Sequence, residues 1–200
     1  RRVATGAVLA VEGDLDVIGC TLSAAFADDP VQVWLWDGAA DPDDARRRFL
    51  RFFVDEYFPL GQVFVVGGGA GAALWAPPER DVLHGPSVED LLAMVTEAIG
   101  DQALPRLAEL SRTSTHRPIR PHFYLGVLGV HPARQGTGLG EVLLAPVLAE
   151  CDRDGIVAHL ESSNPRNLGF YERLGFEAID DFRCGGAGGP LMTVMQRQPA

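Results

Sequence analysis

The chain contains no lysine, and all 17 of its basic residues are arginine. A P-loop holds nucleotide phosphates with a terminal Gly-Lys-Ser/Thr, so this chain lacks the side chain that such a loop needs. Cysteine is scarce as well: Cys20, Cys151 and Cys184 are scattered, and no CxxC pair occurs. The histidines are also dispersed, and no group of Cys and His has the spacing of zinc ligands. We therefore expect no metal site, and we expect the thiols to be buried or inert.

Long apolar runs are missing too. Charged residues or glycine interrupt each run well before the ~20 residues that a membrane-spanning helix needs. The segment after Arg1 and Arg2 has no signal-peptide core that ends in a cleavage site. These absences predict a cytoplasmic protein that does not enter a membrane.

Basic residues are fewer than acidic residues, so the formal net charge is -10 at pH 7. An acidic chain repels the phosphate backbone, so nucleic acid is not an expected partner. The same negative field modestly favours a cationic amine as a ligand. The run 46–48, which is three consecutive arginines, is expected to form a solvated helix face rather than a binding patch.

What is present is an alternation of strand-like and helix-like segments over 200 residues, enough for one sizeable core. The pattern predicts a single domain over 1–200, with an α/β or α+β sheet covered by helices. Strands are expected at 3–11, 62–66, 72–76, 123–130, 156–161, 176–182 and 191–195. Helices are expected at 15–26, 45–57 after Pro42, 87–99 with Ser87 as N-cap, 102–110, 139–152 and 168–173. A homodimer is compatible with the sequence.

The segment that carries the most chemistry is a glycine-rich loop between a strand and a helix. The apolar strand ends at Val130, and glycines at 136, 138 and 140 lead directly into an amphipathic helix. Glycine lets the backbone approach a ligand closely and frees successive amides to point outward. The first amides of the helix are unpaired and carry partial positive charge, so the loop predicts a pyrophosphate site without a basic side chain.

Another phosphate-binding pattern has to be compared with this loop. A Rossmann unit needs GxGxxG after a first strand, with an acidic residue about 20 residues later. The run 136–140, GTGLG, is one residue too short, and it comes late in the chain. A plain strand-to-helix turn remains the alternative to a phosphate site.

Two motifs carry a family resemblance. The segment 130–140, VHPARQGTGLG, resembles the GNAT acyltransferase motif V-x-P-x-x-Q/R-G-x-G-x-G. The segment 164–176, NPRNLGFYERLGF, is similar to the second signature of that superfamily, N-x-x-x-x-x-F-Y-x-x-x-G-F. The order of the motifs and the gap between them also match.

The similarity extends towards the puromycin N-acetyltransferase group. The segment 160–168, LESSNPRNL, resembles its L-E-T-S-x-P-R-N-L, and 24–30, AAFADDP, resembles its A-A-F-A-D-x-P. The segment 73–75, ALW, is similar to a V-W-T-P-type strand of that group. The resemblance covers most of the chain and is strongest from 121 to 177.

The resemblance implies a GNAT fold with a mixed central sheet that splays after the fourth strand. It implies a coenzyme A core at 121–177 and acceptor-shaping helices at 15–60 and 87–112. The pantetheine would pair with backbone like an added strand, and the pyrophosphate would lie on the loop amides. The residues that it implies for acetyl-coenzyme A are Leu128, Gly129, Val130, Gln135, Gly136, Thr137, Gly138, Leu139, Gly140, Glu141 and Asn167.

The resemblance also implies direct attack of an amine on the acetyl thioester, with Tyr171 as acid. A tyrosine with its ordinary pKa of ~10 stays protonated at neutral pH and can donate to a thiolate whose ordinary pKa is ~8.5. Glu161 is the candidate base, although a glutamate with a pKa of ~4.3 needs burial or a bound water to help it. A structural Glu161–Arg166 pair and His159 as base are the alternatives.

Aromatic residues are expected to line the acceptor pocket, because they stack on planar or cyclic groups. The candidates are Phe26, Trp34, Trp36, Phe58, Trp75 and Phe123. Trp34 and Trp36 are expected to flank a turn above the cleft. The implied acceptor is the amine of a small molecule, such as an aminoacyl-nucleoside antibiotic or an amino-sugar-like compound. A protein or peptide N-acetyltransferase and a non-catalytic acetyl-coenzyme A sensor are the alternatives.

Overall fold

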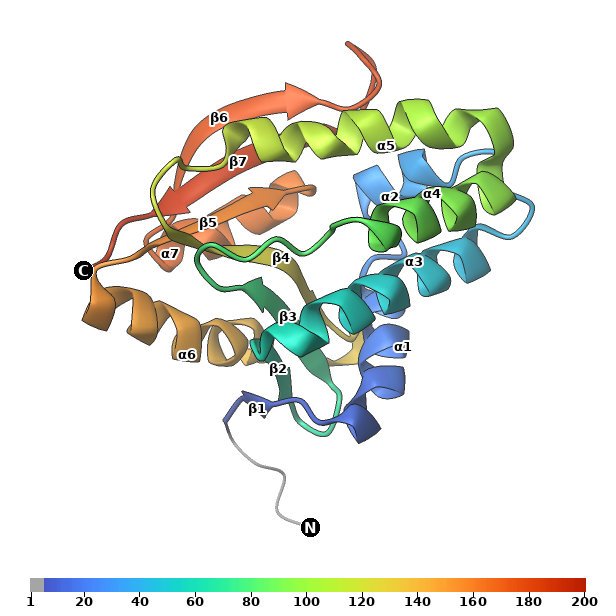
Figure 1. Cartoon of the computed structure of the whole chain (residues 1–200). Coiled ribbons are helices and arrows are strands. Elements are labelled where there is room, and N and C mark those ends of the chain that lie inside the picture. Colours follow the sequence, from blue (N-terminus) through green and yellow to red (C-terminus); the bar gives the residue numbers. More distant parts are fainter. Residues whose placement is uncertain (1–5) are drawn as a thin grey trace.

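A single seven-stranded sheet forms the centre of the molecule in a computed structural model, which describes residues 6–200 (Figure 1). The strand order is β1-β2-β3-β4-β5-β7-β6, and only β4 and β5 run parallel. The mixed sheet that the sequence predicts is therefore confirmed. The strands are β1 (Val8–Leu9), β2 (Val63–Val66), β3 (Gly71–Ala76), β4 (His122–Val130), β5 (Val157–Ser162), β6 (Glu177–Arg183) and β7 (Leu191–Arg197).

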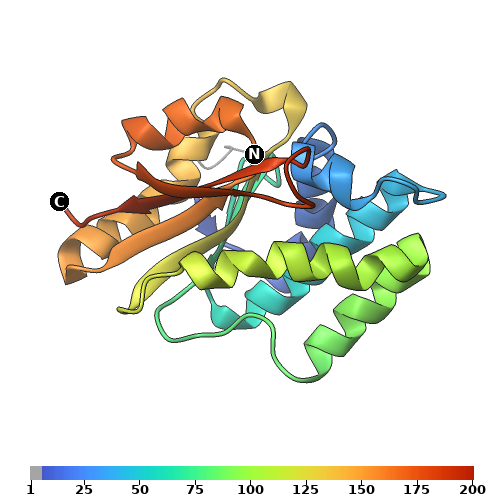
Figure 2. The same ribbon diagram turned by 90° about the horizontal axis from the view of Figure 1, so that it is seen from above.

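Helices cover both faces of this sheet (Figure 2). On one face lie α1 (Leu15–Ala25), α3 (Pro42–Tyr57), α4 (Pro86–Ile99) and α5 (Ala103–Ser111), which pack around one apolar cluster. On the other face lie α6 (Leu139–Asp154) and α7 (Leu168–Arg173), which pack around a second cluster. The short α2 (Pro30–Leu35) places Val31 against β6 and β7 in a third cluster.

The start of α3 follows from its sequence. Asp41 is the N-cap and accepts a hydrogen bond from the amide of Asp44, and Pro42 occupies the first turn, where its missing N–H costs nothing. The buried side of the helix carries Phe49 and Leu50, which pack into the first cluster. The same two side chains also line a cavity beside the sheet.

One local prediction was wrong, and two others hold only in part. Ser87 does not cap α4, because the helix already begins at Pro86. The N-cap residue is Gly85, which has no side chain to accept a cap hydrogen bond. In the run 46–48, Arg47 and Arg48 are exposed as predicted, but Arg46 is buried, and its Nε donates to the carbonyl of Ser23 at 3.0 Å. The predicted first strand extends into residues outside the described range, and within that range only Val8–Leu9 pairs with β2.

The remaining predicted elements lie close to the observed bounds. The hairpin of β2 and β3 forms around the glycine turn at 67–69, where all three glycines have positive φ. Within residues 6–200, no helix combines the length and the apolar character that crossing a membrane requires.

Candidate active site

Strands β4 and β5 separate part-way along their length. Their parallel pairing ends at Leu125 and Leu160, although β4 continues to Val130. At the same point Gly126 has no partner in β3, which is the pattern of a β-bulge. A bulge bends and twists its strand, so residues 126–130 turn away from β5 and leave backbone groups on that side without a strand partner. The sheet is therefore splayed after its fourth strand, as predicted.

Glycine is required at the bulge because a helix approaches it closely. A Cβ atom at position 126 would lie 1.8 Å from the hydroxyl oxygen of Tyr57, which is buried on α3. Gly129 is also constrained, because a Cβ there would lie 2.7 Å from Leu22 on α1. The splayed half of β4 thus packs against α1 and α3. Its unpaired backbone groups lie on the edge that points away from β3.

The loop after β4 has the geometry that an anion site needs. Gly136 and Gly138 have φ values of 71° and 82°, in the left-handed region that favours glycine. The first intrahelical bond of α6 runs from the amide of Val142 to the carbonyl of Gly138, so the amides of residues 139–141 have no partner in the helix. These amides and the helix dipole face an exposed loop, and they would suit a phosphate group.

Two side chains hold this loop in shape. Gln135 donates from Nε2 to the carbonyl of Val130 at 3.1 Å, and Thr137 donates from its hydroxyl to the carbonyl of Arg134 at 2.6 Å. Gly140 lies against α7, because a Cβ there would come within 3.0 Å of the Phe170 ring. The loop residues predicted from the sequence therefore lie close together in the structure. Their free backbone amides would suit a pyrophosphate without a basic side chain.

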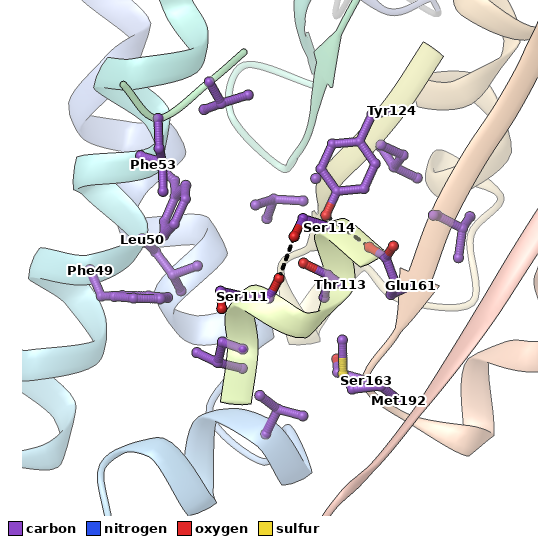
Figure 3. Close-up of a pocket in the computed structure, with 18 of the residues that line it drawn as sticks. Phe49, Leu50, Phe53, Ser111, Thr113, Ser114, Tyr124, Glu161, Ser163 and Met192 are labelled. Atoms are coloured by element: carbon purple, nitrogen blue, oxygen red, sulfur yellow. Dashed lines mark hydrogen bonds between the residues drawn. The ribbon is translucent and has the colours of Figure 1, made fainter. Parts of the chain in front are cut away.

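A cavity of about 630 Å³ lies beside the splayed strands. Its apolar part is formed by side chains of α3, α4 and α5, among them Phe49, Leu50 and Phe53 (Figure 3). Its polar part is formed where the segment after α5 meets β4 and β5, and it includes Tyr124 and Glu161. The volume and the mainly apolar lining with a few convergent polar groups are typical of a small-molecule site.

Glu161 is the centre of the polar part. Tyr124 donates from its hydroxyl to Oε2 of Glu161 at 2.8 Å (Figure 3), and Nε2 of His159 lies 2.8 Å from Oε1. Arg166 makes no ion pair with Glu161 in the described part of the chain, so the structural Glu161–Arg166 pair was wrong. His159 is fully buried and does not line the cavity, so it lies behind Glu161 as seen from the cavity.

Tyr171 faces the same cavity from α7. Its ring packs against Phe170 and Phe176, with centroids 5.1 and 5.8 Å away, which fixes the direction of the hydroxyl. Burial, with a smaller contribution from the charge of Asp29, raises the pKa of Tyr171 well above its ordinary value. The phenol is therefore protonated throughout the neutral range, so its O–H is present in the cavity as a donor.

The architecture and the loop have counterparts among known proteins. A family model described as acetyltransferase (GNAT) domain matches residues 95–196, about half of the chain. The chain belongs to the GNAT acetyltransferases. Family membership identifies it as an enzyme, an N-acetyltransferase rather than a non-catalytic sensor. Acetyl-coenzyme A is the acetyl donor of this family.

Individual proteins are similar to this chain in sequence or in fold. An uncharacterized N-acetyltransferase of Schizosaccharomyces pombe is 28% identical over 174 residues, which cover 82% of this chain and 70% of the yeast protein. A histone acetyltransferase HPA2-related acetyltransferase of Corynebacterium glutamicum has a similar fold, with a TM-score of 0.67, 24% identity, and coverage of 98% and 96% of the two chains. Arylalkylamine N-acetyltransferase 2 of Aedes aegypti also has a similar fold, with a TM-score of 0.66, 13% identity, and coverage of 97% and 98%.

The residues predicted for acetyl-coenzyme A divide into two groups in this GNAT chain. Leu128 and Asn167 line the cavity, whereas Gly129 is buried against α1. Val130 and residues 135–141 lie beyond the cavity, along the splayed end of β4 and the start of α6. No group of three potential metal ligands gathers within residues 6–200.

The aromatic predictions divide as well. Phe26 lines the cavity. Trp75 and Phe123 do not, because both lie in the apolar cluster on the α6 face of the sheet. Trp34 lies near the end of α2, just before the turn at 36–38, but it does not line the cavity, and the guanidinium of Arg106 stands 5.8 Å from its ring centroid.

Trp36 is also a core residue, because it is 2% exposed and packs edge-on against Phe49 with a centroid distance of 5.4 Å. Phe58 likewise does not line the cavity.

Asp29 is a site residue that sequence reasoning missed. It caps α2 through the amides of Val31 and Gln32, and its Oδ2 accepts a hydrogen bond from the hydroxyl of Ser163 at 2.5 Å. Burial raises the pKa of Asp29, and these hydrogen bonds oppose that shift. The contact ties the start of α2 to the segment that leads from β5 to α7. An Asp directly before Pro30 was the available signal, since this pair is typical of a helix start.

Proposed function

We propose that this enzyme transfers the acetyl group of acetyl-coenzyme A to the primary amine of a small molecule that has an apolar body. The observation that carries the proposal is one cavity that reaches Tyr171, Glu161 and the splayed edge of β4 and is lined mainly by apolar side chains. A donor that enters along β4 and an acceptor that enters between α3 and α5 would meet at this point.

The donor side rests on backbone geometry. The coenzyme pantetheine would pair with the free edge of β4 at Leu128 and Val130, and its pyrophosphate would lie on the amides from Gln135 to Glu141. Asn167, which borders the cavity, would contact the pantetheine or its phosphate end. The left-handed φ at Gly136 and Gly138 supports this arrangement because it turns successive amides outward.

The chemistry needs one proton removed and one supplied. Bound acetyl-coenzyme A provides a thioester, at which a C–N bond to the amine forms and the C–S bond breaks. Glu161 takes the proton that the amine loses, directly or through a water, while Tyr124 and His159 hold its two oxygens in place. Tyr171 donates its proton to the departing sulfur and regains one from solvent or from the amine.

The acceptor side favours a small molecule over a peptide. A peptide substrate needs an open groove, whereas this cavity is bounded by α3, α4, α5 and the sheet. The apolar lining supports an acceptor whose body is aromatic or aliphatic. The arylalkylamine N-acetyltransferase of Aedes aegypti, by its name, acts on amines of that kind. An aminoacyl-nucleoside antibiotic, which the puromycin N-acetyltransferase resemblance implies, belongs to the same broad class.

An acceptor screen tests the proposal. Purified enzyme with acetyl-coenzyme A is expected to release free thiol when aromatic or aliphatic primary amines are added, and mass spectrometry is expected to show the N-acetyl product. Short peptides with free N-termini, an aminoacyl-nucleoside and polyamines are screened in parallel under the same conditions. Turnover of peptides alone would contradict the small-molecule proposal, and no turnover of any amine would contradict the function as a whole.

A further inference from the structure

Arg117 is the one basic residue among the cavity-lining side chains of the described chain. It follows the 3-10 segment Arg112–His116, which leads from α5 towards β4. Its guanidinium stands 4.0 Å from the ring centroid of Tyr124, and its Nε is buried without a hydrogen-bond partner. Within residues 6–200 it forms no ion pair. A positive charge that is partly removed from water and unpaired is costly.

Other packed arginines of this chain are satisfied. Arg46, whose side chain is 10% exposed, binds the carbonyl of Ser23 and the carboxylate of Asp43. Arg197, whose side chain is 12% exposed, makes a two-point ion pair with Asp152. Arg117 differs from these two arginines, because its guanidinium stacks on the Tyr124 ring and forms no ion pair within residues 6–200, and a guanidinium fork is well suited to a carboxylate. This contrast indicates that the partner of Arg117 arrives with a ligand.

The position of Arg117 relative to Glu161 defines what that ligand contains. Both groups contact Tyr124. Arg117 lies over its ring, and Oε2 of Glu161 accepts a hydrogen bond from its hydroxyl oxygen at 2.8 Å. A positive and a negative group therefore flank one side chain at the polar end of the cavity. Phe49 and Phe53 lie towards the apolar end (Figure 3). This arrangement matches a molecule that has an acid group, an amine and a bulky apolar group close together.

We propose that the acceptor is a free amino acid with a large apolar side chain, whose carboxylate pairs with Arg117. Its amine faces Glu161, and its side chain enters the space between α3 and α5. The inference rests on the proposed N-acetyltransferase function and specifies its substrate class. It also accounts for how an acidic protein accepts a substrate that carries a carboxylate, because Arg117 offsets the repulsion at the point of contact.

The test compares amines that differ only in the carboxylate. Kinetic constants are measured by thiol release for L-phenylalanine against 2-phenylethylamine and for L-leucine against 3-methylbutylamine, with L-phenylalaninamide as the neutral analogue. The wild-type enzyme is expected to prefer each amino acid in kcat/KM by about 100-fold, as for a desolvated ion pair. In Arg117→Gln this preference is expected to fall to about one, mainly through KM.

Arg120→Gln is the control, because Arg120 is exposed in the same segment and binds Gln198 instead of facing the cavity. It is expected to keep the preference of the wild type. A wild-type enzyme that uses 2-phenylethylamine or the amide as well as phenylalanine would overturn the inference, even if Arg117→Gln failed to fold. An equal loss for both members of each pair in Arg117→Gln would also overturn it, since that result marks a structural role.

The same measurements distinguish failure of the carboxylate inference from failure of the proposed acetyl transfer. If amines without an acid group react and amino acids do not, the carboxylate inference fails and the acetyl transfer stands. If no amine of either kind reacts, the proposed function itself fails.

Discussion

Tyr171→Phe is expected to lower kcat by about 100-fold or more while leaving the affinity for acetyl-coenzyme A nearly unchanged. The phenylalanine ring keeps the packing against Phe170 and Phe176, so the fold is expected to persist. Only the proton donor for the departing sulfur is removed. The rate is measured by thiol release under saturating substrates, and the affinity by isothermal titration.

Tyr57→Phe is the matched control for this prediction. Tyr57 is also buried and lines the same cavity, and burial also raises its pKa, but its hydroxyl packs against Gly126. Its loss is expected to change kcat by a few-fold at most. If Tyr171→Phe turned over as fast as the wild type, Tyr171 would have no role as acid, and water would have to supply the proton.

Glu161→Gln is expected to lower kcat at pH 7 by about 100-fold, because the variant keeps the shape of the side chain but loses the base. The deficit is expected to narrow as the pH rises towards 9, since an alkylamine with an ordinary pKa of ~10.4 then loses more of its proton to solvent. Measurement of kcat and kcat/KM across this pH range separates lost basicity from lost binding. Tyr124 and His159 remain available to hold the amide in position.

Glu172→Gln, which neutralises an exposed carboxylate on α7, is the control and is expected to behave as the wild type. A deficit in Glu161→Gln that stays the same at every pH would indicate a positioning role instead of proton transfer. A full rate in Glu161→Gln together with a loss in His159→Asn would assign the base to His159.

The parts of the site that could be predicted from sequence are local. The glycine loop is set by φ values that glycine favours at 136 and 138 and by the unpaired first turn of α6, all within a few residues of one another. The splay of the sheet was implied by resemblance to GNAT proteins. In the structure it has a visible cause in the bulge at Gly126, whose signal in the sequence is one glycine within an apolar strand.

The acceptor side could not be predicted, because it depends on which face of an element meets which neighbour. Every residue of β3 is buried, so its pattern does not alternate and does not tell on which face Trp75 lies. Trp34 lies in a six-residue helix, which is too short to show a helical period. Arg117 stands in a polar, proline-containing segment, and only the packing of α3, α5 and β4 makes it a cavity residue.

Isothermal titration of the wild-type protein with acetyl-coenzyme A tests the central claim most directly. One saturable site with a micromolar Kd is expected. Gly138→Val is expected to weaken binding by about tenfold, because a left-handed φ of 82° at a β-branched residue costs about 1–2 kcal/mol and the loop relaxes to avoid it. Gly186→Val carries the same strain at a φ of 88° in the turn between β6 and β7, and it is expected to bind as the wild type does. No heat of binding at high micromolar acetyl-coenzyme A, or an equal loss in both variants, would contradict the assignment of the donor to this loop.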